Sequence, residues 1–132
     1  MAMESFKIAA SERSPEVNFD FDGCRLSLRG ESYPEDASAV FGPLFSALER
    51  FLATVGDREF VVEFNLTYFN SSSAKALMNM LQLLDHAAGA GARVSVSWFF
   101  APDDDTMKEF GEDFSEDLAH VAFSLVAVEP AA

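Results

Sequence analysis

Residues 59–100 read EFVVEFNLTYFNSSSAKALMNMLQLLDHAAGAGARVSVSWFF, and this stretch decides the fold. From Glu59 to Leu66, apolar side chains stand at every second position, which predicts a strand that is buried on one face. From Ser72 to Ala88 they recur every three to four residues, which predicts an amphipathic helix. From Arg93 to Phe100 the period returns to two. A strand, a helix and a strand in this order form a βαβ unit, in which the two strands lie parallel.

The segments around this unit supply the rest of the expected fold. Three strands precede it, over Phe6 to Ala9, Val17 to Phe21 and Arg25 to Arg29, and a last strand spans Ala122 to Val128. Asp22-Gly23 is a two-residue hairpin signal between the second and third strands. One helix is expected to end near Val55, and another opens within Ala101 to Asp105 and runs to about Leu118. These elements predict an α/β (α+β) fold, a mixed β-sheet of about five to six strands with three helices packed mainly on one face.

The start of the first helix is less regular than the rest. Ser32 and Glu35 have the spacing of a capping box, and Asp36 is a rival N-cap. Pro43 then falls inside the apolar pattern of the helix, where its missing N–H and its ring are unfavourable. We therefore expect the helix to begin near Gly42, with Pro43 in its first turn.

Composition limits the classes of function. The chain of 132 residues has the size of a single domain, residues 1–132, and its 14 Phe predict a phenylalanine-rich core. The formal net charge of −13 repels nucleic acids and anionic membrane surfaces, so neither is expected as a partner. Cys24 is the single cysteine, no apolar run has the length of a membrane helix, and residues 1–10 lack a signal-peptide pattern. We expect a cytoplasmic protein that is a monomer or a weak dimer.

The serines at the start of the central helix are the strongest functional signal. Residues 65–75 read NLTYFNSSSAK and lead from a strand end into a helix N-terminus, where sites tend to lie in open α/β sheets. Ser and Asn are also preferred helix caps, so capping explains these residues without any further function. A phosphate on one of the serines would be stabilised by the helix dipole and by free N–H groups. The residues alone leave both interpretations open.

No catalytic or metal-binding pattern stands out. The acidic residues between Asp103 and Asp117 lack the spacing of a calcium loop, so we expect a solvated helix face or a partner patch. His86 and His120 belong to no nucleophile motif. The aromatic run Trp98 to Phe100 fits core packing before it fits a docking ridge. We expect no enzymatic activity, no catalytic residue, no metal and no cofactor.

Three segments of the chain resemble a known family. They are LSLRGESYPED at residues 26–36, YFNSSSAK at residues 68–75, and the strand Val94 to Phe100 together with EFGEDFSED at residues 109–117. These segments resemble the SiaC-type bacterial regulatory phosphoproteins, which are similar to STAS domains of anti-sigma-factor antagonists. The resemblance covers most of the chain and implies a STAS-like fold.

The resemblance also implies a partner switch. In such a switch a protein kinase phosphorylates the residue after the Asn of the YFN motif, and a PP2C-type phosphatase removes the phosphate. The unmodified form binds and activates a diguanylate cyclase, with cyclic di-GMP and biofilm formation or aggregation downstream. By position the phosphoacceptor is Ser71, and Ser72 and Ser73 leave the choice open, with Ser72 the next candidate.

The resemblance further implies a partner surface made of two segments. Its expected residues are Glu31, Tyr33, Pro34, Tyr68, Phe69, Asn70 and Lys75. The first three are expected to lie near Ser71 at one end of the sheet. Two alternatives stay open, a STAS-type antagonist that acts on an anti-sigma kinase and a constitutive binding domain.

Overall fold

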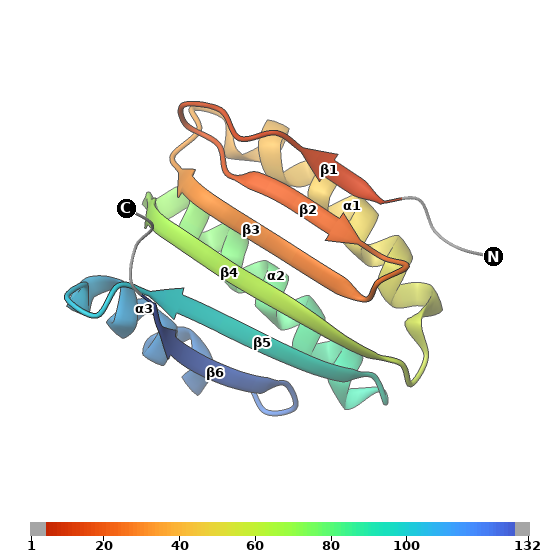
Figure 1. Cartoon of the computed structure of the whole chain (residues 1–132). Coiled ribbons are helices and arrows are strands. Elements are labelled where there is room, and N and C mark those ends of the chain that lie inside the picture. The colour runs from red at the N-terminus through yellow and green to blue at the C-terminus, as the bar shows by residue number, and fades with distance from the viewer. Residues whose placement is uncertain (1–4, 129–132) are drawn as a thin grey trace.

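A six-stranded mixed sheet and three helices form the fold. The computed structural model describes residues 5–128, so residues 1–4 and 129–132 of the expected domain lie outside it. In chain order the elements are β1 (Phe6–Ile8), β2 (Glu16–Asp20), β3 (Arg25–Ser32), α1 (Ala37–Val55), β4 (Glu59–Phe69), α2 (Ser71–Gly89), β5 (Arg93–Phe100), α3 (Asp105–Glu116) and β6 (Ala122–Ala127). Figure 1 shows the strands side by side in this same order.

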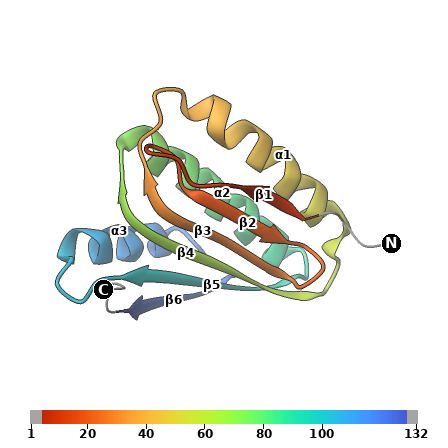
Figure 2. The same cartoon turned by 45° about the horizontal axis from the view of Figure 1, so that its top comes forward.

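Strand direction divides the sheet in two. The strands β1, β2 and β3 form an antiparallel meander, whereas β3, β4, β5 and β6 are parallel neighbours joined through helices. All three helices lie on the same face of the sheet, as the two views in Figures 1 and 2 agree. The expected α/β fold is therefore confirmed, including the βαβ unit β4-α2-β5.

The core lies between the helices and one face of the sheet. The strand β4 buries Phe60, Val62, Phe64 and Leu66, and α2 buries Leu77, Met80, Leu81 and Leu84, each at most 3% exposed. Burying one such side chain stabilises the fold by about 1.5–3 kcal/mol. The opposite face of the sheet carries polar side chains at its centre, with Ser27, Glu63 and Ser97 side by side across three strands. Among the described residues, no helix is long and apolar enough to cross a membrane.

The helix α1 begins earlier than the sequence suggests. Its N-cap is Asp36, whose carboxylate accepts a hydrogen bond from the N–H of Ala39 at 3.2 Å. The expected capping box at Ser32 is wrong, because Ser32 ends β3 and Asp36 already supplies the acceptor that the first turn needs. A start near Gly42 is also wrong, since Pro43 lies inside the helix. Gly42 has no Cβ to meet the proline ring, which removes one of the clashes that usually end a helix before a proline.

The β2–β3 hairpin is confirmed, but its turn is longer than the expected two residues. The connection spans residues 21–24, and the carboxylate of Asp20 accepts a hydrogen bond from the N–H of Gly23 at 2.9 Å. A Cβ atom at Gly23 would lie 2.5 Å from Oδ2 of Asp20, so a larger residue there would displace the Asp20 side chain from this position. The left-handed conformation falls on Cys24, with φ of 56°. The turn is therefore shaped by Asp20 and not by a glycine at positive φ.

The strand β4 continues past its expected end at Leu66 and reaches Phe69. It does so because β3 continues alongside it to Ser32. The register shifts by one residue before Glu31, which pairs with Tyr68. Tyr68 and Phe69 of the YFN motif therefore end a paired strand, and Asn70 follows directly after it.

A single carboxylate ties the α3–β6 connection to α2. Asp85 Oδ1 accepts hydrogen bonds from the backbone N–H groups of Ala119, His120 and Val121, at 3.1, 2.7 and 3.1 Å. Desolvation by partial burial raises the pKa of Asp85, but these hydrogen bonds and the nearby His120 outweigh it. The net result is a pKa below the ordinary value of 3.8.

Replacing Asp85 with alanine should lower the free energy of unfolding by about 1–2 kcal/mol at neutral pH, because three N–H groups lose a charged acceptor. Since the folded pKa is depressed, the carboxylate stabilises the fold fully above the ordinary value of 3.8 and loses this effect as the pH falls through the folded pKa. Urea denaturation at neutral pH and at about pH 3 should show a smaller difference at the acidic pH. His86→Ala, at an exposed position of α2, is the control. An equal difference at both pH values would contradict the assignment.

Candidate functional site

The candidate site is built at the junction between β4 and α2. Asn70 is the N-cap of α2, and its side-chain Oδ1 accepts a hydrogen bond from the N–H of Ser73 at 3.0 Å. The N–H of Asn70 donates to the carbonyl of Ser32 at 3.0 Å, and its carbonyl accepts from the N–H of Ala74 at 2.9 Å. The junction therefore holds β3, β4 and α2 together at the carboxyl ends of parallel strands, where sites tend to lie in open α/β sheets.

The three serines after Asn70 differ in their access to solvent. Ser73 and Ser32 are both 0% exposed, and their hydroxyl oxygens lie 2.8 Å apart in a hydrogen bond. Ser71 and Ser72 are exposed and occupy the first two positions of α2. The backbone N–H groups of a first helical turn have no acceptor within the helix. Since Asn70 already caps the N–H of Ser73, a phosphate on Ser71 or Ser72 would lie beside the N–H groups of those two residues, at the positive end of the helix dipole.

Two tyrosine side chains lie at the carboxyl ends of β3 and β4, from which Asn70 leads into these serines. Tyr68 is 52% exposed, and its ring packs edge to face against Tyr33 with 5.7 Å between the ring centroids. Glu31 is exposed and stands opposite Tyr68 in the β3–β4 register. The N–H of Tyr33 donates to the carbonyl of Arg13 at 2.7 Å, which fixes the segment after β3. We call the surface formed by Glu31, Tyr33, Tyr68, Ser71 and Ser72 the serine edge.

Two of the expected partner residues lie beneath this surface. Phe69 is 6% exposed, and its ring packs against Trp98, Phe110 and Phe114. Pro34 is also buried. Phe69 and Pro34 are therefore not part of the exposed surface, whereas Glu31, Tyr33 and Tyr68 are brought together there.

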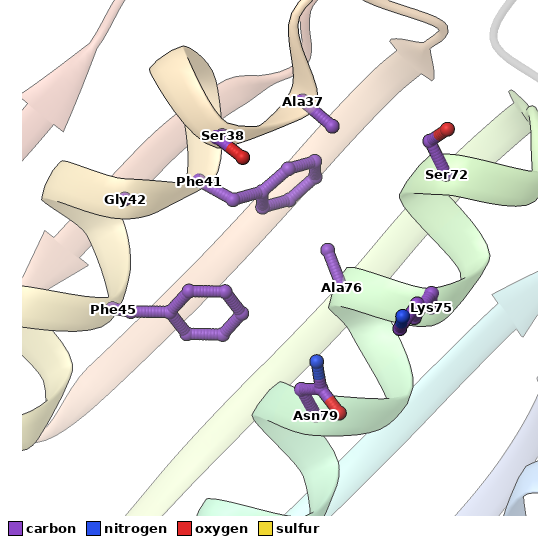
Figure 3. A pocket seen from close by; sticks show the side chains of 9 residues that line it. All are labelled: Ala37, Ser38, Phe41, Gly42, Phe45, Ser72, Lys75, Ala76 and Asn79. Atoms are coloured by element: carbon purple, nitrogen blue, oxygen red, sulfur yellow. The ribbon is translucent and has the colours of Figure 1, made fainter.

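Lys75 lies further along α2, at a groove between α1 and α2. The groove has a volume of about 400 Å³. Figure 3 shows the rings of Phe41 and Phe45 pointing from α1 toward α2. We call this hollow the α1–α2 groove, lined by Ser38, Phe41 and Phe45 on one side and by Ser72, Lys75 and Asn79 on the other. Ser72 belongs both to the serine edge and to this groove, so the two surfaces meet.

The charges at the site are sparse. Within residues 5–128 the two ion pairs join Arg13 to Glu35 and Arg25 to Glu63, and neither involves Lys75. No group of three or more His, Cys, Asp or Glu side chains in this part of the chain is placed to hold a metal ion. The groups that gather here are two exposed hydroxyls, two tyrosine rings and one cation. Such groups can accept a phosphate and contact another protein.

The sequence pattern of a known family, described as SiaC family regulatory phosphoprotein, matches residues 8–128 of this chain. The chain belongs to the SiaC family. Solved structures agree with this assignment. Apo-SiaC from Pseudomonas aeruginosa is 36% identical with a TM-score of 0.86, over 95% of this chain and 100% of that one.

Two further relatives come from the same species. A structure of the P. aeruginosa diguanylate cyclase SiaD in complex with its activator SiaC matches at 35% identity and a TM-score of 0.87, over 93% of this chain and 99% of the matched chain. An uncharacterized protein of P. aeruginosa strain UCBPP-PA14 is 36% identical over 117 residues, which are 89% of this chain and 92% of that protein. The six-stranded sheet with three helices is thus the SiaC-family fold.

Sequence reasoning missed the pairing of Ser32 with Ser73 and the α1–α2 groove. The two serines are 41 residues apart, so no local pattern joins them. One signal was present, because Ser73, Ala76, Leu77 and Met80 fall on one apolar stripe of α2. A serine in such a stripe requires a buried hydrogen-bond partner. No sequence signal separates Phe45, which is half-buried at the groove, from the fully buried phenylalanines.

Replacing Ser73 with alanine should lower the free energy of unfolding by about 1–2 kcal/mol, because the hydroxyl of Ser32 then stays buried without a partner. The variant with both serines replaced should lose less than the sum of the two single variants, since neither hydroxyl remains to be satisfied. Urea denaturation of the wild type, both single variants and the double variant measures this coupling. Strictly additive losses would mean that the two hydroxyls do not interact.

Proposed function

We propose that this SiaC-family protein is a non-enzymatic switch whose unphosphorylated form binds and activates a diguanylate cyclase, and that phosphorylation of Ser71 releases the cyclase. A cognate protein kinase adds the phosphate, and a PP2C-type phosphatase removes it. Membership of a family of regulatory phosphoproteins supports the modification. The complex of SiaD with its activator SiaC in P. aeruginosa supports the choice of partner. Cyclic di-GMP is then the output of the switch.

The observation that carries the proposal is the exposed hydroxyl of Ser71 at the start of α2, next to the cap residue Asn70. Ser73 is fully buried and already paired, which leaves Ser71 and Ser72 as acceptors that a kinase can reach. Ser71 is favoured because it directly follows the Asn of the YFN motif. Phosphate adds about −1.5 to −2 charge units, and the helix N-terminus stabilises this charge. The modification can therefore persist without disturbing the fold.

The serine edge supports release by electrostatics. Its tyrosines are residues that protein interfaces favour, and Tyr68 is the more exposed of the two. A phosphate on Ser71 would have to lose its water when a partner covers the serine edge, which costs on the order of several kcal/mol. Because each 1.4 kcal/mol is about a factor of ten in affinity, such a cost releases the partner.

Phosphorylation of Ser71 should weaken binding to the cyclase by about a hundredfold or more, given a desolvation cost of several kcal/mol. Intact-mass and fragment-ion analysis of the protein purified from its own host should place a phosphate of about 80 Da on Ser71. Calorimetry of the phosphorylated and unphosphorylated forms with the diguanylate cyclase of the same organism then measures the change in affinity. Cyclic di-GMP production in the same mixtures measures activation.

The matched control compares two neighbouring serines. Ser71→Ala should bind and activate the cyclase even when the kinase and ATP are present, whereas Ser72→Ala should still be released. Phosphate found only on Ser72 would mean that Ser72, and not Ser71, is the phosphoacceptor. Protein that stays free of phosphate under all growth conditions, with Ser71→Ala indistinguishable from the wild type, would rule out the switch.

A further inference from the structure

We propose that the α1–α2 groove docks an amphipathic helix of the partner, with an acidic side chain over Lys75 and a basic side chain over Glu49. This inference rests on the proposed function, because the partner meant is the diguanylate cyclase. It adds a second contact surface beside the serine edge and states the chemistry that the surface recognises.

The shape of the groove fits a helix. Beyond Phe45 and Asn79 the α1–α2 groove continues into a second hollow of about 410 Å³, which these two residues share with Glu49, Gln82 and Leu83. The two hollows together follow α2 from Ser72 to Leu83, a rise of about 16 Å, or roughly three helical turns. A helix of that length offers apolar anchors at positions i, i+3 or i+4, and i+7. Phe45 borders both hollows, so its ring lies near the middle of this run, where a central apolar anchor of the docked helix would contact it.

The walls of the groove exclude an extended peptide. Both walls are helices, whose interior N–H and C=O groups are bonded within the helix and offer no main-chain partners. An extended segment lying on Phe41 and Phe45 would bury backbone N–H and C=O groups without partners, which is costly. A helix satisfies these groups internally. The groove therefore selects a helix over a strand.

The charged residues of the groove determine which charged side chains the docked helix should carry. Lys75 lies at one end of the combined groove and Glu49 at the other, and neither forms an ion pair among the described residues. Both side chains are exposed. A helix with an acidic residue at one end and a basic residue at the other complements both. The wrong charge order would place like charges together and weaken binding.

The groove also adds a route for phosphorylation to act. Ser72 lines the groove three residues before Lys75, which is the spacing at which side chains on a helix meet. Ser71 lies four residues before Lys75, the other spacing at which side chains on a helix meet. A phosphate on either serine would therefore compete for Lys75 and repel the acidic side chain of the docked helix.

Filling the groove tests the docking directly. Asn79 is exposed at the centre of the combined groove, and tryptophan has a helix propensity similar to that of asparagine. Asn79→Trp should therefore fold normally. In the unphosphorylated form it should bind the cyclase about tenfold or more weakly than the wild type, an effect of the size found when one central contact is lost. His86→Trp places the same side chain at an exposed position of α2 outside the groove and should bind within about twofold of the wild type. Calorimetry gives the affinities, and circular dichroism confirms the fold of both variants.

Removing the cation tests the charge pairing. Lys75→Gln should bind about threefold more weakly at low salt, and its affinity should depend less on salt than that of the wild type. Lys108→Gln, on α3 and away from the groove, is the matched control and should leave both properties unchanged.

The outcomes separate the groove from the proposed function. If the wild type binds the cyclase and Asn79→Trp binds equally well, the groove is not a docking site, while the proposed function stands. If Asn79→Trp weakens binding and Lys75→Gln changes neither affinity nor salt dependence, the helix docks without an acidic partner for Lys75, and that part of the proposal is wrong. If the wild type does not bind the cyclase at all, the proposed function fails and the groove proposal fails with it.

Discussion

Asn70 joins β3, β4 and α2 through its backbone and its side chain together, and the candidate site depends on this junction. Its N–H bonds to Ser32 on β3, and its side chain caps α2 at Ser73. The hydroxyls of Ser32 and Ser73 then close the same junction from inside the core. Asn70, Ser32 and Ser73 are buried or half-buried, and their polar groups are paired. These hydrogen bonds fix the start of α2 relative to the sheet. The exposed serines that follow Asn70 are held on a rigid support.

This rigidity determines how a phosphate can act here. The helix α2 carries part of the core, with Leu77, Met80 and Leu84 fully buried, so its first turn cannot move freely without loss of packing. A phosphate at the helix start is instead stabilised where it is. The signal would therefore be a change of surface charge next to Tyr68 and Lys75, and not a refolding of the domain. Such a change acts on a partner through desolvation and repulsion.

The distribution of charge supports the same interpretation. The chain carries a formal net charge of −13, yet Lys75 lies without an ion pair in the described structure, beside the apolar rings of Phe41 and Phe45. A lone cation next to apolar side chains is the recognition element that the proposed docking would use in a protein that otherwise repels anions. A phosphate nearby would neutralise that element. The serine edge and the α1–α2 groove therefore form one continuous surface, with Ser72 common to both.

Much of the fold and part of the site followed from local sequence patterns. The alternation in β4 and β5 and the apolar stripe of α2 predicted the βαβ unit, because periodicity reports which face of each element is buried. The preference of Asn and Ser for helix starts placed the serines at the head of α2. The start of α1 was misjudged, because Pro43 outweighed Asp36 in the local pattern, although Gly42 lacks the Cβ that would meet the proline ring. The sequence by itself thus determined the elements, their buried faces and the position of the serine cluster. Only the tertiary structure decided that Ser73 is hidden, that Phe69 is core and that Phe45 borders a groove, because exposure depends on contacts between segments far apart in the chain.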